Sequence, residues 1–286
     1  MSATSRTGKA GGPSILVSKS QGPRDYMEDR HCAVRGAGAV VVGVFDGHGG
    51  SDVAAHASKV LPRLILRGWP QIAYHTLPSP DEKSHAPMAV FFKDAFLQAD
   101  AAAKAALGAS RNSVGSTACV AVVDRGGGHV WVANSGDSRC VLRTARDVVQ
   151  MSADHKPEVA SEHARIVAEG GYVANVYGIH RVNGNLSVSR SLGDWYMRPY
   201  VIPHPGVSCR RMRGDEVYLL VASDGLWDVF DARTACAFFE KSMHRRGCAD
   251  ASADIAKAQK LALKRLVAEA RRRGSQDNIT VILYVF

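Results

Sequence analysis

Acidic residues stand at the ends of four apolar, strand-like runs of this sequence. They are Asp46 after the run Val40–Phe45, Asp224 after Val217–Ala222, Asp277 before Ile279–Phe286, and Glu28 and Asp29 before His31–Val34. A carboxylate beside a buried strand is unfavourable unless a partner satisfies it, and several carboxylates together repel one another unless cations lie between them. Strands of one sheet could bring these ends together, and the sequence then predicts a cation site. Taken alone, Asp46-Gly47 also fits an ordinary turn.

The types of ligand indicate which cation such a site would hold. The candidate ligands are carboxylate oxygens, with a backbone carbonyl as a further candidate, and no pair of His or Cys accompanies them. Hard oxygen ligands suit Mg²⁺ or Mn²⁺ rather than zinc or copper. Two such ions that share one carboxylate can bind a water and turn it into hydroxide near neutral pH, and hydroxide is a nucleophile for phosphorus.

Arg24 and His48 lie close in the sequence to these acids and could complete the same chemistry. The planar guanidinium of Arg24, four residues before Glu28, matches the oxygens of a phosphate group. His48, two residues after Asp46, could give a proton to a leaving group, since an unperturbed imidazole titrates at about pH 6.5. Arg24 could instead pair with Asp25 at the surface, and His48 could be a turn residue.

The elements that would position these residues are short strands and helices. β-Branched and aromatic residues indicate strands over Ile15–Lys19, His31–Val34, Val40–Phe45, Thr117–Val123, Val130–Asn134, Cys140–Arg143, Val217–Ala222 and Ile279–Phe286. The connection between Thr117–Val123 and Val130–Asn134 is too short for a crossover. We therefore expect these two strands to pair antiparallel.

Helical periodicity covers the segments between these strands. They are Ser51–Leu66, Met88–Leu107 after Pro87, Pro157–Glu169, Asp231–His244 and Ala251–Arg273. Gly170-Gly171 and Gly274 stand where left-handed helix caps are expected. The apolar face of the last helix is formed by Ala262, Leu263, Leu266, Val267 and Ala270. Strands in hairpin groups, covered by paired helices, indicate an α+β fold with antiparallel sheets.

Two segments are expected to be irregular. Residues 68–87 are rich in Pro, His and Ser and predict a surface loop, and residues 171–199 predict a long irregular segment of a kind that often carries function. The small, polar residues 1–13 are expected to form a flexible leader and not a secretory signal. No repeat or linker divides the remainder, so residues 14–286 are predicted to form a single domain.

The composition is that of a folded, soluble protein. Of the 286 residues, 46% are hydrophobic and 22% are charged, and no apolar run is long enough to span a membrane. The net charge of +9 comes from scattered residues, which favours a solvated basic surface over a nucleic-acid site. The six cysteines form no CxxC pair, so we expect reduced thiols in a cytoplasmic or nuclear protein.

Nine short blocks occur in order along the chain. They are SQGPRDYMED, VFDGHGG, VGSTACV, ANSGDSRCVL, DHKPE, EGGYV, LSVSRSLGD, ASDGLWDV and SQDNITVILY, between about Ser20 and Phe286. Together they resemble the metal-dependent serine/threonine protein phosphatases of type 2C. The resemblance implies an α-β-β-α sandwich, in which two stacked antiparallel β-sheets are flanked by pairs of antiparallel helices. It also implies hydrolysis of phosphoserine and phosphothreonine in proteins by a hydroxide bridging two Mg²⁺ or Mn²⁺ ions, with no phosphoenzyme intermediate.

The resemblance implies a metal-binding role for each matching acid. Asp46 would bind both metals. Asp224 and Asp277 would complete the coordination of one metal, largely with waters. Glu28 and the backbone carbonyl of Gly47 would complete the coordination of the other.

The resemblance assigns the remaining chemistry to neighbouring residues. Arg24 would hold the phosphate, and His48 would protonate the departing serine or threonine oxygen. A further set is expected in a second layer around the ligands, or at a weaker third metal site: Asp29, Asp137, Asp228 and Asn278. Within this set, Asp137 would join Asp224 at the third metal, and Asn278 would orient its neighbours rather than bind metal.

The same resemblance implies a monomer that acts on phosphorylated proteins. The scattered basic charge and the lack of a long apolar run favour neither a nucleic-acid nor a membrane partner. Residues 171–199 would be a flap beside the site that shapes substrate choice. From the residues themselves, we expect Trp227 to pack in the core because of its size and Arg190 to form a structural ion pair. Two rival functions remain: a two-metal nuclease, which the basic charge would suit, and a catalytically weak, phosphoprotein-binding regulator of the same fold. A kinase is disfavoured because the sequence has neither a Walker A loop nor an HRD-type catalytic loop.

Overall fold

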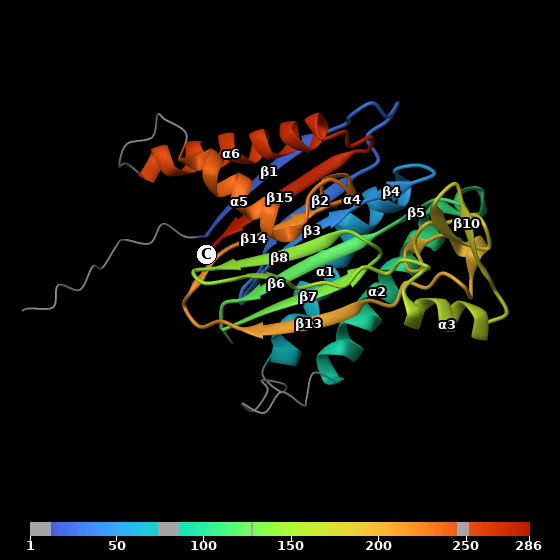
Figure 1. The fold of residues 1–286 in the computed structure, drawn as a ribbon. Coiled ribbons are helices and arrows are strands. Elements are labelled where there is room, and N and C mark those ends of the chain that lie inside the picture. The colour runs from blue at the N-terminus through green and yellow to red at the C-terminus, as the bar shows by residue number, and fades with distance from the viewer. Residues whose placement is uncertain (1–12, 74–85, 127, 245–251) are drawn as a thin grey trace, which may run out of the picture.

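Two five-stranded antiparallel sheets stack face to face in the computed structural model, which describes residues 13–73, 86–126, 128–244 and 252–286 (Figure 1). The first sheet has the spatial order β1 (Ser14–Ser20), β15 (Ile279–Val285), β14 (Glu216–Ala222), β8 (Arg139–Thr144) and β9 (Val148–Gln150). The second has the order β13 (Gly206–Arg211), β7 (His129–Ser135), β6 (Ala118–Asp124), β3 (Ala39–Phe45) and β2 (Arg30–Arg35). The predicted α+β class with stacked antiparallel sheets is confirmed. Of the predicted leader 1–13, only Pro13 lies within the described residues.

A pair of long helices packs on the outer face of each sheet. The second sheet is covered by α1 (Asp52–Ala73) and α2 (Ala86–Leu107), and the first by α5 (Ala232–Met243) and α6 (Ser252–Arg272). Shorter elements gather at one end of the sandwich. The helices among them are α4 (Asp224–Trp227), α3 (Ala160–Ala168) and the 3₁₀ helices η1 (Ala109–Arg111) and η2 (Trp195–Met197). The strands are the hairpin β10 (Val173–Val176) and β11 (Ile179–Val182) and the small sheet β12 (Leu192–Gly193), β5 (Gly115–Ser116) and β4 (Gly47–His48). No described helix combines the length and the apolar character needed to cross a membrane.

Three apolar layers hold these elements together. Strand β3 contributes to two of them, because alternate side chains of a strand point to opposite faces. Phe45 packs on the side of α1 and α2, whereas Val44 lies between the sheets. All of β3 is buried, which explains its uninterrupted apolar sequence.

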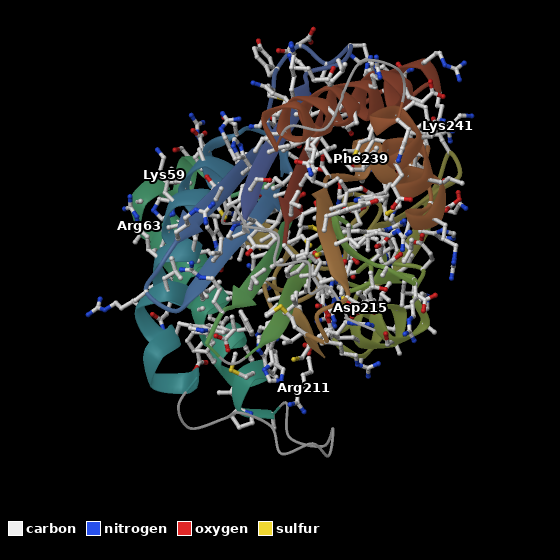
Figure 2. All side chains as sticks on the ribbon, turned by 90° about the vertical axis from the view of Figure 1, so that its left-hand side faces the viewer. Lys59, Arg63, Arg211, Asp215, Phe239 and Lys241 are labelled. Atoms are coloured by element: carbon white, nitrogen blue, oxygen red, sulfur yellow. The ribbon has the colours of Figure 1, made fainter. Side chains whose placement is uncertain are left out.

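The third layer lies between the first sheet and the helices α5 and α6. Phe239 is buried in it, whereas Lys59 and Arg63 point outward from α1 (Figure 2). Trp227 is 5% exposed and donates a hydrogen bond from Nε1 to the Ala222 carbonyl at 2.8 Å, so its predicted place in the core is confirmed. The predicted apolar face of α6 is also buried in this layer.

Helix α1 is longer than the sequence predicts. It continues to Ala73 because Trp69 is buried against Phe91 and Phe92 of α2. Gly68, which signalled a loop in the sequence, permits this contact, since a Cβ at this position would lie 2.6 Å from the Phe91 ring. The expected loop is therefore wrong for residues 68–73 and for 86–87, which begin α2, while residues 74–85 lie outside the described part.

The segment 171–199 is less irregular than predicted. It contains the β10–β11 hairpin, whose turn holds Tyr177 at a φ of 52° and Gly178 at a φ of 87°. Positive φ at both central residues is typical of a type I′ turn, whose twist matches that of the two strands. Helix α3 begins at Ala160 instead of Pro157. Strand β13 was not predicted, because it is a half-buried edge strand that mixes apolar and basic residues.

Candidate active site

The predicted acidic residues come together at one end of the sandwich. Strand β2 begins opposite the end of β3, so Asp29 lies beside Asp46. Strand β15 begins near the end of its partner β14, so Asp277 and Asp224 share that end of the first sheet. The acids that interact electrostatically with Asp46 are Asp29, Asp137, Asp224 and Asp277. The stacking of the sheets thus joins strand ends that are far apart in the sequence.

Burial and mutual repulsion raise the pKa values of these acids. The pKa of Asp46 lies well above its usual range, first because burial removes water from the carboxylate and then because of the neighbouring acids. The pKa of Asp224 is raised in the same way, by burial and then by Asp137, Asp228 and Asp277. Burial also raises the pKa values of Asp29 and Asp137. Without a cation, this cluster retains protons that the same groups would lose in water.

Two oxygen atoms in the cluster have no hydrogen-bond partner among the described residues. These buried atoms are Oδ1 of Asp29 and Oδ1 of Asp224. Oδ2 of Asp29 accepts a hydrogen bond from the Ser223 hydroxyl at 2.8 Å, and the carboxyls of Asp29 and Asp224 both lie within hydrogen-bonding reach of Asp46. A buried acceptor without a partner is unfavourable. A divalent cation would satisfy these oxygens and remove the repulsion.

The donors suit Mg²⁺ or Mn²⁺ in their chemistry, but they do not form a finished coordination shell. All are carboxylate oxygens, which hard divalent ions prefer. Among the described residues, no group of three or more His, Cys, Asp or Glu side chains is already arranged so that it could hold a metal ion.

The loop before β2 carries Arg24 and Glu28 and is clamped by Asn278. Nδ2 of Asn278 donates to the carbonyls of Gln21 at 2.8 Å and Tyr26 at 3.0 Å. Oδ1 of Asn278 accepts from the backbone N–H of Glu28 at 2.7 Å. These three hydrogen bonds fix the loop against the start of β15, beside Asp277.

The pair β4–β5 and the side chain of Thr117 position the Asp46-Gly47-His48 sequence. The backbone N–H of Asp46 donates to Oγ1 of Thr117 at 3.1 Å, and its carbonyl accepts from the Thr117 N–H at 2.8 Å. A Cβ on Gly47 would lie 2.8 Å from the backbone oxygen of Glu28. Glycine is therefore needed at position 47 for the Glu28 loop to approach Asp46.

His48 has a partner that sequence reasoning missed. Its Nε2 lies 2.7 Å from Oδ2 of Asp194, a residue whose side chain is 1% exposed. Burial alone would lower the pKa of His48, but the hydrogen bond and the charge of Asp194 outweigh burial and raise the pKa. Asp194 ends the block LSVSRSLGD, which is the one sequence signal that could have singled it out.

A cleft of about 440 Å³ lies beside the acidic cluster. Arg24, Asp224 and Asp277 line one side of it, and residues 178–181 of the β10–β11 hairpin line another. Asp137 and Asp228 also face this cleft, and Nζ of Lys156 lies 3.5 Å from Oδ2 of Asp137. The flap thus contributes to the wall of the predicted site.

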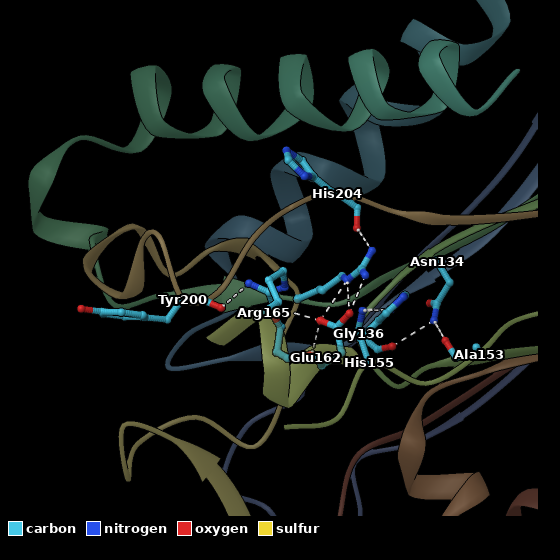
Figure 3. Close-up of polar contacts among 10 residues, drawn as sticks. Asn134, Gly136, Ala153, His155, Glu162, Arg165, Tyr200 and His204 are labelled. Carbon is cyan, nitrogen blue, oxygen red and sulfur yellow. Dashed lines mark hydrogen bonds and ion pairs between the residues drawn. The ribbon is translucent and has the colours of Figure 1, made fainter. Parts of the chain in front are cut away.

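The flap is anchored through a buried ion-pair network around Glu162. Arg190 donates to Oε1 of Glu162 at 2.5 Å and Arg165 donates to Oε2 at 2.9 Å, so the structural ion pair predicted for Arg190 is present (Figure 3). The Ser189 hydroxyl donates to Oε2 at 2.8 Å. Burial alone would raise the pKa of Glu162, but the hydrogen bonds from Arg190 and Arg165 lower it to about 2.

Comparison with known proteins assigns a family. The sequence profile of the family described as "Protein phosphatase 2C" matches residues 14–279. The chain is 34% identical over 93% of its length to "Probable protein phosphatase 2C 2" and 39% identical over 84% to "Protein phosphatase 2C 53", both from Oryza sativa subsp. japonica. These alignments span 69% and 57% of the lengths of the two relatives.

Solved structures show the same fold. A serine-threonine phosphatase 2C from Toxoplasma gondii superposes with a TM-score of 0.76 at 24% identity, over 95% of this chain and 94% of that one. A C. elegans sex determining protein superposes with a TM-score of 0.80 at 24% identity, over 97% of this chain and 66% of that one. At this level of identity, the likeness concerns the fold.

Proposed function

The chain belongs to the protein phosphatase 2C family, and on that basis we propose that it hydrolyses phosphoserine and phosphothreonine in proteins with two Mg²⁺ or Mn²⁺ ions. The observation that carries the proposal is the group of acids around Asp46, which interact with one another and leave an oxygen of Asp224 without a partner. Arg24 lines the cleft beside these acids. His48 lies on β4, two residues after Asp46.

We propose Asp46 as the ligand that both ions share. Asp224 and Asp277 would complete one site, and Glu28 with the carbonyl of Gly47 would complete the other. When bound, the ions would lower the pKa of a water molecule toward neutrality and offset the negative charge of the phosphoryl group.

The remaining acids would support these ligands. Asp29, which is fully buried, would hold Asp46 through their contact. Asp137 interacts with Asp224 and would join it at a weaker third ion. Asp228, which is exposed, would add negative charge at the same side of the cleft.

The side chains that would act on the substrate are Arg24 and His48. Arg24 would donate to the phosphoryl oxygens, and His48 would give a proton to the serine or threonine oxygen as it leaves. The attacking oxygen would come from water, so no residue would become phosphorylated. Consistent with this route, burial raises the pKa of Cys32 to about 12, which makes this thiol a poor nucleophile.

The proposal is tested by hydrolysis of a phosphoserine peptide with added Mn²⁺ or Mg²⁺ and with chelator. We expect turnover only with the ions, and a loss of at least about a hundredfold in Asp46→Asn and Asp224→Asn. The matched control is Asp147→Asn, which changes an exposed acid in the turn between β8 and β9. Full activity in chelator, or in Asp46→Asn, would refute the proposal.

The rival functions are outcomes of the same experiment. Turnover of DNA or RNA without turnover of the phosphopeptide would indicate a nuclease. Tight Mn²⁺ binding without turnover of any substrate would indicate a phosphoprotein-binding regulator. We also propose that the protein acts as a monomer, and sedimentation of the active sample tests this: a dimer at the concentration used for activity would contradict it.

A further inference from the structure

The contact between His48 and Asp194 has features that ordinary surface pairs lack. Oδ2 of Asp194 lies 2.7 Å from Nε2 of His48 and 2.5 Å from the hydroxyl of Ser191, while Oδ1 is buried without a hydrogen-bond partner among the described residues. In the part of the chain that the structure describes, no arginine or lysine forms an ion pair with Asp194. The imidazole is thus the basic group that this buried carboxylate contacts.

The backbone around Asp194 is built to hold this contact. Asp194 adopts a φ of 47° and a ψ of 39°, a left-handed conformation that costs an ordinary residue on the order of 1 kcal/mol. Its N–H donates to the carbonyl of Val114 at 3.0 Å. On either side, the N–H of Gly193 and the indole of Trp195 donate to the buried carboxylate of Asp100 in α2, at 2.7 and 3.1 Å. The turn that carries Asp194 is therefore tied to a long helix.

Strand β5, which pairs with β4, has a glycine where the side chains of His48 and Asp194 meet. A Cβ on Gly115 of β5 would lie 2.0 Å from Oδ2 of Asp194 and 2.3 Å from Nε2 of His48. No other residue could stand at position 115 without breaking the contact. Three separate parts of the chain thus meet at one hydrogen bond: His48, Gly115 and the segment that carries Ser191 and Asp194.

We infer that Asp194 is the positioning residue of His48. It accepts the Nε2–H of the imidazole and so fixes the ring orientation and leaves Nδ1 as the nitrogen that faces the substrate. In the step that this serves, the bond between phosphorus and the seryl oxygen breaks and the oxygen keeps the electron pair. The oxygen takes the proton from Nδ1 of the doubly protonated imidazole, which becomes the neutral ring with its proton on Nε2, while water supplies the new oxygen on phosphorus. The inference rests on the proposed phosphatase function.

The test compares two leaving groups in Asp194→Asn. A serine alkoxide needs a proton as it leaves, whereas a nitrophenolate does not, so loss of a positioned general acid should affect only the first. With Mn²⁺, we expect kcat on a phosphoserine peptide to fall by about a hundredfold with KM changed less than about threefold, and kcat on nitrophenyl phosphate to fall less than about threefold. In a His48→Ala background, Asp194→Asn should cause no further loss.

Matched controls separate positioning from simple destabilisation. Asp124→Asn removes another buried carboxylate, at the end of β6, and should leave the ratio of the two activities unchanged. For the wild-type protein, ¹⁵N NMR of the imidazole, assigned with His48→Gln, should report Nε2–H in the neutral ring, and this measurement does not depend on folding of the Asp194 variant. Three results would overturn the inference: an Nδ1–H tautomer, equal losses of activity on both substrates, or a further loss in the His48→Ala background. The proposed function would stand in each case, provided that the wild-type protein is active. A wild type inactive on both substrates would overturn the proposed function and this inference with it.

Discussion

Arg24 donates a hydrogen bond from Nη2 to Oδ2 of Asp277 at 2.6 Å, so the side chain proposed to hold phosphate is paired with one proposed to hold metal. The two side chains are 54% and 29% exposed, and ion pairs that are open to solvent contribute about 1 kcal/mol or less. This pairing excludes the alternative in which Arg24 merely pairs with Asp25. If Asp277 binds a cation as proposed, the exposed guanidinium of Arg24 would be free to donate to a phosphate group instead.

We expect Arg24→Ala to weaken phosphopeptide binding. A hydrogen bond to a charged group contributes about 1.5–3 kcal/mol, which corresponds to a rise in KM of roughly tenfold to a hundredfold. Arg24→Lys should recover part of this loss, because lysine keeps the charge without the planar fork. Steady-state kinetics with Mn²⁺ in excess measures both effects, and Arg146→Ala, in the exposed turn between β8 and β9, is the control. If Arg24→Ala instead weakened Mn²⁺ binding and left KM unchanged, a role in phosphate binding would be ruled out.

Asp46→Asn should change the stability of the metal-free protein in the direction opposite to its effect on activity. The pKa of Asp46 is higher in the folded than in the unfolded chain. Its contribution to the unfolding free energy is therefore fully present below the unfolded pKa of about 3.8 and is lost as pH rises through the raised folded pKa. In chelator at pH 7.5, Asp46→Asn should be more stable than wild type by on the order of 1–3 kcal/mol, and the two should converge toward pH 4.

Added Mn²⁺ should reverse this order, since ligand binding stabilises only the protein that binds. Urea unfolding with and without Mn²⁺ measures both differences, and Asp147→Asn should follow wild type throughout. An Asp46→Asn protein that is less stable than wild type in chelator would mean that the acids around Asp46 do not repel one another.

The acids of the site could be found from the sequence because each stands beside an apolar run. Asp46 and Asp224 follow strands that are buried on both faces, and such strands are easily recognised. That their ends meet depends on the order of strands in two sheets, which no local pattern encodes. The type of fold and the list of acids were therefore predictable, whereas the contacts between acids needed the structure or the family resemblance.

The elements that were missed are set by packing between distant residues. Asp194 is 146 residues from His48, and apart from its place at the end of the block LSVSRSLGD nothing in the sequence marks it as a buried acid. Gly68 resembled a loop signal, but its missing side chain serves contact between α1 and α2. Half-buried edge strands such as β13 lack the regular alternation that identifies a strand.

Glu162→Gln should loosen the flap. The side chain of Glu162 is 3% exposed and binds Arg165, Arg190 and Ser189. Removing one partner of a buried ion pair costs about 3–5 kcal/mol. Because the flap lines the cleft, KM for a phosphopeptide should rise as well. Urea unfolding and steady-state kinetics measure the two effects, with Glu169→Gln, which changes an exposed acid at the C-terminal end of α3, as control. A loss below about 0.5 kcal/mol would mean that the network does not anchor the flap.

His155 should make the protein sensitive to mild acid. Nδ1 of its buried ring accepts from the N–H of Gly136 at 3.4 Å, and burial together with Arg190 lowers the pKa of the imidazole to about 4 (Figure 3). Since the folded pKa lies below the unfolded value of about 6.5, the stabilisation is fully present above pH 6.5 and is lost as pH falls through 4. One pKa unit corresponds to about 1.4 kcal/mol, so the loss from this residue could reach about 3 kcal/mol.

The measurement is the unfolding free energy between pH 7.5 and pH 4.5 for wild type, His155→Gln and His163→Gln, the last of which changes an exposed histidine on α3. Comparing slopes instead of absolute values removes the cost of the lost hydrogen bond, which is the same at every pH. The slope should be smaller in His155→Gln than in wild type and unchanged in His163→Gln. Equal slopes in wild type and His155→Gln would show that this ring takes up its proton without unfolding, as an accessible histidine does.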